Sequence, residues 1–143
     1  MADRKANATW KGGVLGGARK IALGSGLFEG AYSFATRIGE EPGTTPEELF
    51  GAALADCYAM ALNATLERDG TPAQEVTAEA VVHLGKDESG YVIKGIDVIA
   101  VAKAASIDDP AFQAIAAQVK ASGPISRALG GTNITLNAVL GQL

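Results

Sequence analysis

The middle of the chain carries a helix signal that constrains the fold more than any other feature. Thr45 can accept the first capping hydrogen bond, Pro46 suits the first helical position because no N–H is needed there, and Glu48 completes a Thr-x-x-Glu capping box. Gly70 is typical of the residue that follows the end of a helix. We therefore predict one long helix from residue 46 to about residue 69.

Apolar residues cover nearly the whole circumference of this predicted helix. They alternate with alanines, which are small enough to let other backbones approach closely. The larger apolar residues are Leu49, Phe50, Leu54, Met60, Leu62 and Leu66. A helix that is apolar all round is typical of a protein interior, so we expect this one to be buried at the centre of the fold.

The flanking sequence predicts several short strands and two further helices. Apolar and polar residues alternate over residues 6–10, 20–23, 32–38, 76–84, 91–101 and 133–140. The fourth and fifth of these strands should form a hairpin, because a turn-like run separates them. Helices are predicted from Asp109-Pro110 onward, with one apolar face, and over residues 124–129. This order of elements predicts an α+β fold in a single domain, residues 1–143.

Composition argues against several classes of protein. The formal net charge is -4 and the basic residues are scattered singly, which does not favour a nucleic-acid partner. One cysteine and one histidine leave too few ligands for the usual zinc site, so we expect no metal and no cofactor. No apolar run is expected to approach the length of a membrane span, and the first residues lack a secretory signal. We expect a cytoplasmic protein that does not bind a membrane.

Three residues around the central helix could carry chemistry, and each also has a structural explanation. Cys57 is the only cysteine, and a buried cysteine often behaves as a small hydrophobic residue. Arg37 could be a solvated residue on a strand. Glu47 could simply complement the positive end of the helix dipole. The spacing of these residues alone leaves both explanations open.

The segment that contains these residues resembles the OsmC branch of the OsmC/Ohr family, the osmotically induced and organic hydroperoxide resistance proteins. The matching runs are Tyr32-Ser33-Phe34-Ala35-Thr36-Arg37, Gly43-Thr44-Thr45-Pro46-Glu47-Glu48-Leu49 and Cys57-Tyr58-Ala59-Met60-Ala61-Leu62. The resemblance implies an OsmC-like fold, with a two-layer mixed sheet, a long buried central helix and an intertwined homodimer. It also implies a thiol-dependent peroxidase that reduces organic hydroperoxides in antioxidant and osmotic stress defence.

The resemblance also implies a role for each candidate residue. Cys57 would attack the peroxide, Arg37 would hold peroxide and thiolate, and Glu47 would orient Arg37. Arg19 is a rival for the arginine, because the Ohr branch carries its catalytic arginine in a glycine-rich segment somewhat like the one around Arg19. We favour Arg37, because the Thr-Arg pair ahead of Gly-Thr-x-Pro-Glu-Glu-Leu matches the OsmC branch.

Thiol chemistry explains why an arginine is needed. A thiol with its ordinary pKa is a few per cent ionised at neutral pH, so full ionisation gains roughly thirtyfold in rate. A fall of ~3 units in a thiol pKa costs roughly twentyfold in nucleophilicity. Because these effects nearly cancel, most of the rate must come from a cation that stabilises the departing alkoxide. The planar fork of a guanidinium can serve thiolate and peroxide together.

Helix geometry predicts that the site is shared between two chains. Glu47 and Cys57 are ten residues apart, which is about 15 Å along a helix axis. We therefore predict that Glu47 of a second subunit orients Arg37 beside Cys57, in a two-fold homodimer. Phe50, Leu54 and Met60 would line a pocket that favours organic peroxides over hydrogen peroxide.

The sequence departs from the family pattern near its end. The family carries a second cysteine in a Cys-Pro-x-Ser run, whereas Gly123 precedes Pro124 and Ser126 here. A sulfenic acid on Cys57 would then need an external thiol to reduce it. We predict a one-cysteine peroxidase. The alternatives are a non-catalytic OsmC-like protein, which binds an apolar small molecule or senses oxidation through Cys57, and a structural dimer with an inert thiol.

Overall fold

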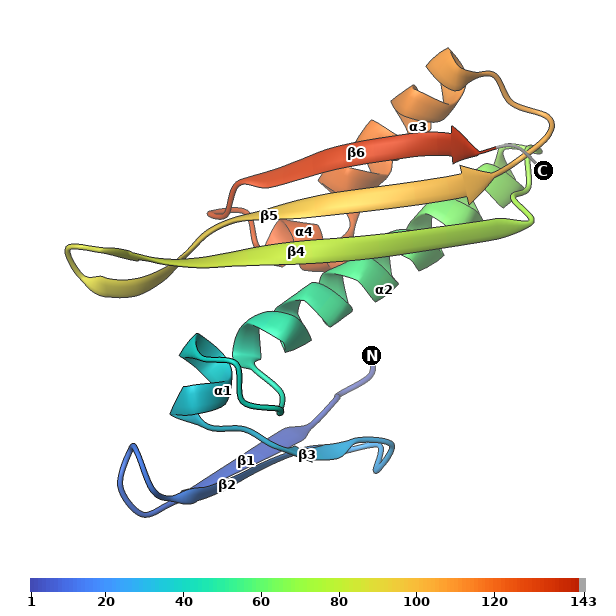
Figure 1. Cartoon of the computed structure of the whole chain (residues 1–143). Coiled ribbons are helices and arrows are strands. Elements are labelled where there is room, and N and C mark those ends of the chain that lie inside the picture. The colour runs from blue at the N-terminus through green and yellow to red at the C-terminus, as the bar shows by residue number, and fades with distance from the viewer. Residues whose placement is uncertain (142–143) are drawn as a thin grey trace. The chain divides into compact units, whose positions relative to one another are not determined.

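The computed structural model describes residues 1–141 of the chain, which form two compact units, one of residues 1–49 and one that begins at Phe50 (Figure 1). The strands are β1 (Ala6–Lys11), β2 (Ala18–Leu23), β3 (Glu29–Ala31), β4 (Glu75–Asp87), β5 (Gly90–Lys103) and β6 (Ile134–Gly141). The helices are α1 (Phe34–Ile38), α2 (Pro46–Arg68), α3 (Asp109–Ser122) and α4 (Pro124–Ala128). The division between the units falls inside α2, after its first turn.

The first unit is built on a three-stranded antiparallel sheet in the order β1-β2-β3. The strands predicted over residues 6–10 and 20–23 are confirmed, each extended by one or two residues. The β1–β2 and β2–β3 connections contain Gly12 and Gly26, with φ angles of 89° and 76°. These left-handed conformations favour glycine, so both connections depend on this residue type.

The strand predicted over residues 32–38 is wrong, because most of this segment forms the short helix α1. The Ser33 hydroxyl accepts a hydrogen bond from the Thr36 N–H (2.9 Å), and the Thr36 hydroxyl accepts one from the Ser33 N–H (2.8 Å). This reciprocal cap stabilises the first turn of a helix. Arg37 therefore lies in the last turn of α1 and not on a strand.

The second unit contains a mixed three-stranded sheet in the order β4-β5-β6. β4 and β5 form the predicted antiparallel hairpin, and β6 pairs with β5 in parallel. The register of the hairpin shifts between His83 and Leu84, which is a β-bulge. The last predicted strand is confirmed, with alternate residues of β6 turned inward.

The hydrophobic core of this unit lies between one face of the sheet and the helices α2 and α3. Its buried members are Leu54, Tyr58, Leu62, Leu66, Ile96, Val98, Ala100, Ala102, Phe112, Ala116, Val119 and Ala138. The sheet residues among them alternate along β5, so they share one face of the sheet and the two helices cover that face. The predicted one-sided helix, now α3, is confirmed with Phe112, Ala116 and Val119 buried.

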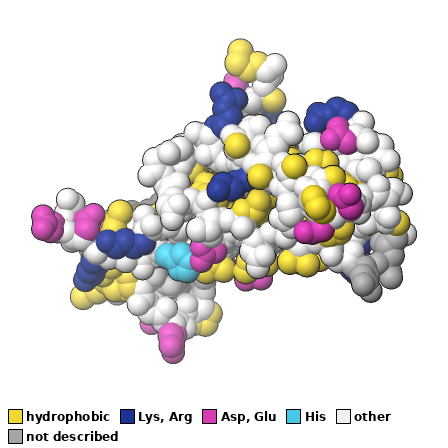
Figure 2. Space-filling view, turned by 90° about the horizontal axis from the view of Figure 1, so that it is seen from above, with side chains coloured by type: hydrophobic (Ala, Val, Ile, Leu, Met, Phe, Trp, Pro, Cys, Tyr) yellow, Lys and Arg dark blue, Asp and Glu magenta, His cyan; other side chains and the backbone are white. Residues whose placement is uncertain are grey.

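The opposite face of the sheet carries polar side chains on adjacent strands. His83 Nε2 lies 2.7 Å from an oxygen of Asp97, and the Thr135 hydroxyl donates to the other oxygen at 2.5 Å. The hydrogen bonds from Thr135 and His83 lower the pKa of Asp97 below its ordinary value. Figure 2 shows the histidine, in cyan, on the surface beside an acidic side chain.

The predicted ends of the central helix are confirmed. The Thr45 hydroxyl accepts a hydrogen bond from the Glu48 N–H at 3.0 Å, which caps the first turn of α2. At the other end, Gly70 has a φ angle of 78° and follows the last helical turn. Gly51 is buried, and a Cβ built there would lie 3.1 Å from the Ala80 carbonyl oxygen. A glycine at this position therefore lets α2 approach β4 closely.

The prediction that α2 is buried all round is wrong for the single chain. Leu54, Tyr58 and Leu62 are at most 3% exposed, whereas Phe50 is 42% and Met60 is 65% exposed. Among the described residues, α2 is also the one helix long and apolar enough to cross a membrane. The expectation that no apolar run reaches this length is therefore wrong. Length and composition alone are weak evidence for a membrane span, because core helices of soluble proteins meet the same criteria.

Candidate active site

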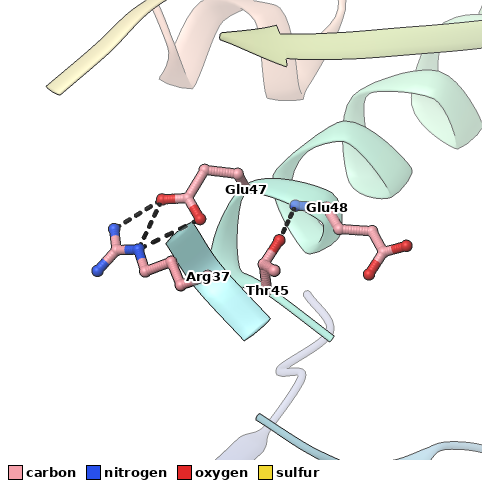
Figure 3. A network of polar contacts seen from close by, with 4 residues as sticks. All are labelled: Arg37, Thr45, Glu47 and Glu48. Atoms are coloured by element: carbon pink, nitrogen blue, oxygen red, sulfur yellow. Dashed lines mark hydrogen bonds and ion pairs between the residues drawn. The ribbon is translucent and has the colours of Figure 1, made fainter. Parts of the chain in front are cut away.

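Arg37 and Glu47 form an ion pair in the first unit (Figure 3). Arg37 Nε donates to Oε1 of Glu47 at 3.0 Å and lies 3.3 Å from Oε2, and Nη2 donates to Oε1 at 2.6 Å. The last turn of α1 supplies the arginine and the first turn of α2 supplies the glutamate. The carboxylate uses two of the three guanidinium nitrogens and leaves Nη1 outside the pair.

The two side chains of the ion pair differ in burial, and the more buried one depends more on the charge of its partner. The Glu47 side chain is 10% exposed and the Arg37 side chain is 41% exposed. A buried carboxylate is costly without a cation or hydrogen-bond donors, so Arg37 compensates the charge of Glu47. The positive end of the α2 dipole acts in the same direction. The pair therefore holds the guanidinium in a defined orientation with part of it accessible.

The pairing corrects one prediction from helix geometry. That argument assigned the orientation of Arg37 to Glu47 of a second subunit, but both side chains belong to the same chain. The reason is that the short loop between α1 and α2 reverses the direction of the chain. Thr44, just before α2, thereby forms an isolated parallel β-bridge with Tyr32, just before α1. Arg37 and Glu47 act as one group within the first unit.

Cys57 lies on α2 in the second unit and is partly exposed. Its sulfur faces the connection between α3 and α4. A Cβ built at Gly123 would lie 3.8 Å from Cys57 Sγ and 3.6 Å from the Ser126 hydroxyl. The position where the family pattern has its second cysteine is therefore next to the thiol in space, although 66 residues separate the two positions in the sequence.

Arg19, the rival of Arg37, is held by the loop that precedes it. Its guanidinium donates to the carbonyl oxygens of Gly13, Val14 and Gly17, the first at 2.7 Å. The guanidinium carbon lies 3.5 Å from the centroid of the Trp10 ring, in a cation–π contact. These contacts give Arg19 a structural role in the β1–β2 connection.

The predicted peroxide pocket on α2 is not formed by the three residues assigned to it. Leu54 is 1% exposed and belongs to the hydrophobic core under the sheet, whereas Phe50 and Met60 are exposed. Leu54 differs because it lies on the side of α2 that faces the sheet. Leu54 is therefore a core residue, and Phe50 and Met60 belong to the uncovered side of the helix.

Comparison with known proteins identifies the family. The model of the family described as OsmC-like protein matches residues 39–138. The chain belongs to this OsmC-like family. The match includes Glu47, Cys57 and Gly123, and begins two residues after Arg37. The OsmC-like fold predicted from the sequence is thereby confirmed.

Individual relatives agree with this assignment. The OsmC-like chain is 35% identical to peroxiredoxin OsmC of Escherichia coli over 127 residues, which cover 88% of this chain and 89% of the relative. It is 26% identical to the organic hydroperoxide resistance protein OhrB of Bacillus subtilis, with a TM-score of 0.71 and coverage of 96% and 98%. An organic hydroperoxide resistance protein of Elizabethkingia anophelis shares the fold, with a TM-score of 0.75, 22% identity and coverage of 97% and 96%.

The sequence did not single out the residues that position Arg37. Ser33 and Thr36 cap α1, and the Thr36 hydroxyl also donates to the Thr44 carbonyl oxygen at 3.1 Å. The Ser-x-x-Thr run was the available signal, but the alternation of residues 32–38 favoured a strand. Through these bonds Thr36, which is 9% exposed, joins α1 to the loop that leads to Glu47.

Proposed function

We propose that this OsmC-like protein reduces organic hydroperoxides, with Cys57 as the attacking thiol and an external thiol as the reductant. The relation to the E. coli peroxiredoxin and to the B. subtilis hydroperoxide resistance protein supports a role in peroxide defence. The observation that carries the proposal is the Arg37–Glu47 pair, which leaves Nη1 of a positioned guanidinium available to a peroxide.

The proposed reaction has two halves. The Cys57 thiolate attacks the terminal oxygen of the hydroperoxide, so that an S–O bond forms while the O–O bond breaks. Sulfur is oxidised by two electrons, and the alkoxide leaves and takes a proton to become the alcohol. A first external thiol then condenses with the sulfenic acid and releases water, and a second thiol frees Cys57 from the mixed disulfide. The sum is one hydroperoxide and two thiols giving an alcohol, water and a disulfide.

Arg37 would act on the step in which charge develops. A guanidinium that binds the leaving oxygen stabilises the alkoxide more than the neutral peroxide, so it lowers the barrier. Glu47 is then a positioning residue, because its carboxylate holds the guanidinium and does not touch the peroxide. Removal of one such donor typically lowers the rate about a hundredfold to a thousandfold.

We further propose a homodimer in which Cys57 of one chain meets the Arg37–Glu47 pair of the other. Ten residues of α-helix separate Glu47 from Cys57, which is about 15 Å along the axis. The uncovered side of α2, with Phe50 and Met60 exposed, is apolar enough to pack against a second copy. We expect a cytoplasmic protein that needs no metal and no cofactor.

One assay tests the proposal. Wild type should consume cumene hydroperoxide in the presence of excess dithiol, and Cys57→Ser should not. Ala64→Ser places a hydroxyl elsewhere on α2 and serves as the matched control, which should keep the activity of the wild type. Equal background rates for wild type and Cys57→Ser would rule out a peroxidase.

Gly123 favours a second candidate, an oxidation sensor. Without a thiol at position 123, the sulfenic acid on Cys57 has no partner in its own chain and can persist. Intact mass after one equivalent of peroxide separates the candidates. A sensor gains oxygen on Cys57 but shows no turnover with dithiol, whereas a peroxidase gains oxygen and turns over. An inert thiol gains no oxygen.

A further inference from the structure

A polar hollow lies in the second unit, where the end of α3, α4 and the start of β6 meet (Figure 1). Its volume is about 300 Å³, which is at the lower end of the range for pockets that bind small molecules. Ile125 and Leu129 pack against the hydrophobic core and thereby fix α4 beside it. The residues that line the polar hollow are Lys120, Ala121, Ser126, Leu129, Gly130, Thr132, Asn133 and Ile134.

The polar side chains of this lining are not used by the rest of the chain. They are one ammonium group, two hydroxyls and one amide, from Lys120, Ser126, Thr132 and Asn133. Within residues 1–141, these four side chains form no hydrogen bond or ion pair with other residues. A cation in the last turn of α3 also complements the helix dipole, but that role needs none of the other three groups.

The local charge indicates what the polar hollow can bind. The segment over residues 120–134 contains Lys120 and Arg127 but no acidic residue, although the whole chain has a net charge of -4. An ammonium group beside hydroxyl and amide donors stabilises an anion that accepts several hydrogen bonds. The polar hollow therefore suits a small molecule with a compact anionic group, such as a carboxylate.

The polar hollow is next to the thiol of Cys57. A Cβ built at Gly123 would lie 3.6 Å from the hydroxyl of Ser126, which lines the hollow, and 3.8 Å from Cys57 Sγ. Both groups are thus within 4 Å of one point, and glycine places no side chain there. These distances are ordinary van der Waals contacts, so a ligand group of the size of a methylene fits at this point. A ligand held in the hollow can reach Cys57 past Gly123.

We propose that the polar hollow binds the carboxylate of the external reductant, which is then a small thiol with a carboxylate group. The inference rests on the proposed function, because it names the reductant of that reaction. Lys120 and Asn133 would hold the carboxylate while the thiol lies beside Cys57. The S–S bond to Cys57 forms as the S–O bond of the sulfenic acid breaks, and water leaves. A second molecule of the thiol then frees Cys57 and releases the disulfide of the reductant.

The first test measures binding without turnover. The probe is 3-(methylthio)propionate, which has the carboxylate but no free thiol, and its affinity is measured by NMR titration. Lys120→Gln removes the charge from the polar hollow and should weaken binding about fivefold, because a charge-assisted hydrogen bond is lost. The result expected for wild type is a set of shifted amide signals around Lys120, Ser126 and Asn133.

Lys103→Gln is the matched control for this variant. It removes the same charge beside Gly141, at the end of β6 remote from the hollow. Its ion pair with Glu75 is partly exposed, so its loss costs little stability. Lys103→Gln should bind the probe like the wild type. A wild type that does not bind the probe, or equal affinities for wild type and Lys120→Gln, would overturn the proposal.

The second test measures the choice of reductant. Cys57 is first oxidised with one equivalent of cumene hydroperoxide, and the loss of the sulfenic acid is then followed with 3-mercaptopropionate and with its neutral amide. The ratio of the two rate constants should fall about fivefold in Lys120→Gln and further in Lys120→Glu, which places a carboxylate in the hollow. Comparing ratios between variants cancels the different intrinsic reactivities of the two thiols. An unchanged ratio would overturn the assignment of the hollow to the reductant.

The two tests separate this proposal from the proposed function. A chain that turns over with both thiols, at a ratio that Lys120→Gln does not change, is a peroxidase whose reductant does not use the hollow. A chain whose Cys57 gains no oxygen contradicts the proposed function and the role of the reductant. The binding test uses neither peroxide nor free thiol, so it still decides whether Lys120 belongs to a carboxylate site.

Discussion

At position 123, a single residue limits the chemistry that is open to Cys57. Gly123 is followed by α4 and has φ and ψ angles of -61° and 141°, which any L-residue can adopt. A Cβ there would have neighbours at 3.5 to 3.8 Å, which is ordinary van der Waals contact. The backbone therefore does not require glycine, and the absence of a second thiol is a chemical difference without a steric cause.

We predict that Gly123→Cys restores an intramolecular disulfide. The new Cβ would lie 3.8 Å from Cys57 Sγ, so a small adjustment brings the two sulfurs to bonding distance. After one equivalent of peroxide, intact mass should show the loss of two hydrogens in place of the gain of an oxygen. During turnover, the external dithiol should then reduce this internal disulfide and no longer a sulfenic acid on Cys57.

Gly131→Cys is the matched control for this variant. Position 131 has open space around it, with nothing within 4 Å of a built Cβ. After one equivalent of peroxide, this variant should gain an oxygen on Cys57 and form no internal disulfide. A Gly123→Cys protein that gains oxygen as the wild type does would contradict the proximity of the two positions.

At the scale of elements, Tyr58 joins the two helices that cover the sheet. Its side chain is 3% exposed, and its hydroxyl donates to the Ala116 carbonyl oxygen of α3 at 3.1 Å. Burial raises the pKa of Tyr58 from 10.0 to about 12. The hydrogen bond and the buried ring together connect α2 to α3 in the core.

We predict that this tyrosine makes the folded state sensitive to alkaline pH. Between pH 10 and 12 the unfolded chain loses the Tyr58 proton while the folded chain keeps it, so the free energy of unfolding falls as pH rises, by at most about 1.4 kcal/mol per pH unit. Tyr58→Phe should cost about 1 kcal/mol below pH 10 through the lost hydrogen bond. Urea unfolding at several pH values should show this difference shrinking above pH 10. A constant difference up to pH 12 would contradict a raised pKa.

The elements also differ in how well local sequence signals predicted them. Both ends of α2 and the start of α3 were predicted correctly, because these boundaries depend on a few adjacent residues such as Thr45 and Asp108. Residues 32–38 were predicted wrongly, because alternation over so short a run fits a strand and a helical turn equally well. The Thr36 contacts with Ser33 and Thr44 favour the helix.

At the scale of the whole molecule, the two halves of the proposed site belong to different units of the chain. Arg37 and Glu47 lie in the first unit, and Cys57 lies in the second with Gly123. The proposal of a homodimer assigns each site to the first unit of one chain and the second unit of its partner. Mixed dimers of inactive variants can test that assignment directly.

We predict that Cys57→Ser and Arg37→Gln are each nearly inactive alone and regain activity together. After random mixing by joint refolding, half of the dimers contain one chain of each kind, and each of these has one complete site. Peroxidase activity should therefore recover to about a quarter of that of the wild type. Two different affinity tags confirm the mixing. Mixed dimers that stay inactive would contradict a site shared between chains.

The features that the sequence predicted correctly depend mostly on neighbouring residues, whereas the candidate site depends on the tertiary structure. The cap of α2, the hairpin turn and the glycine in place of a cysteine can all be read from a few adjacent positions. The pairing of Arg37 with Glu47 in one chain, the burial of Leu54 and the proximity of the polar hollow to Cys57 required the fold. They depend on contacts between residues distant in sequence, whose distances are determined only when the chain packs.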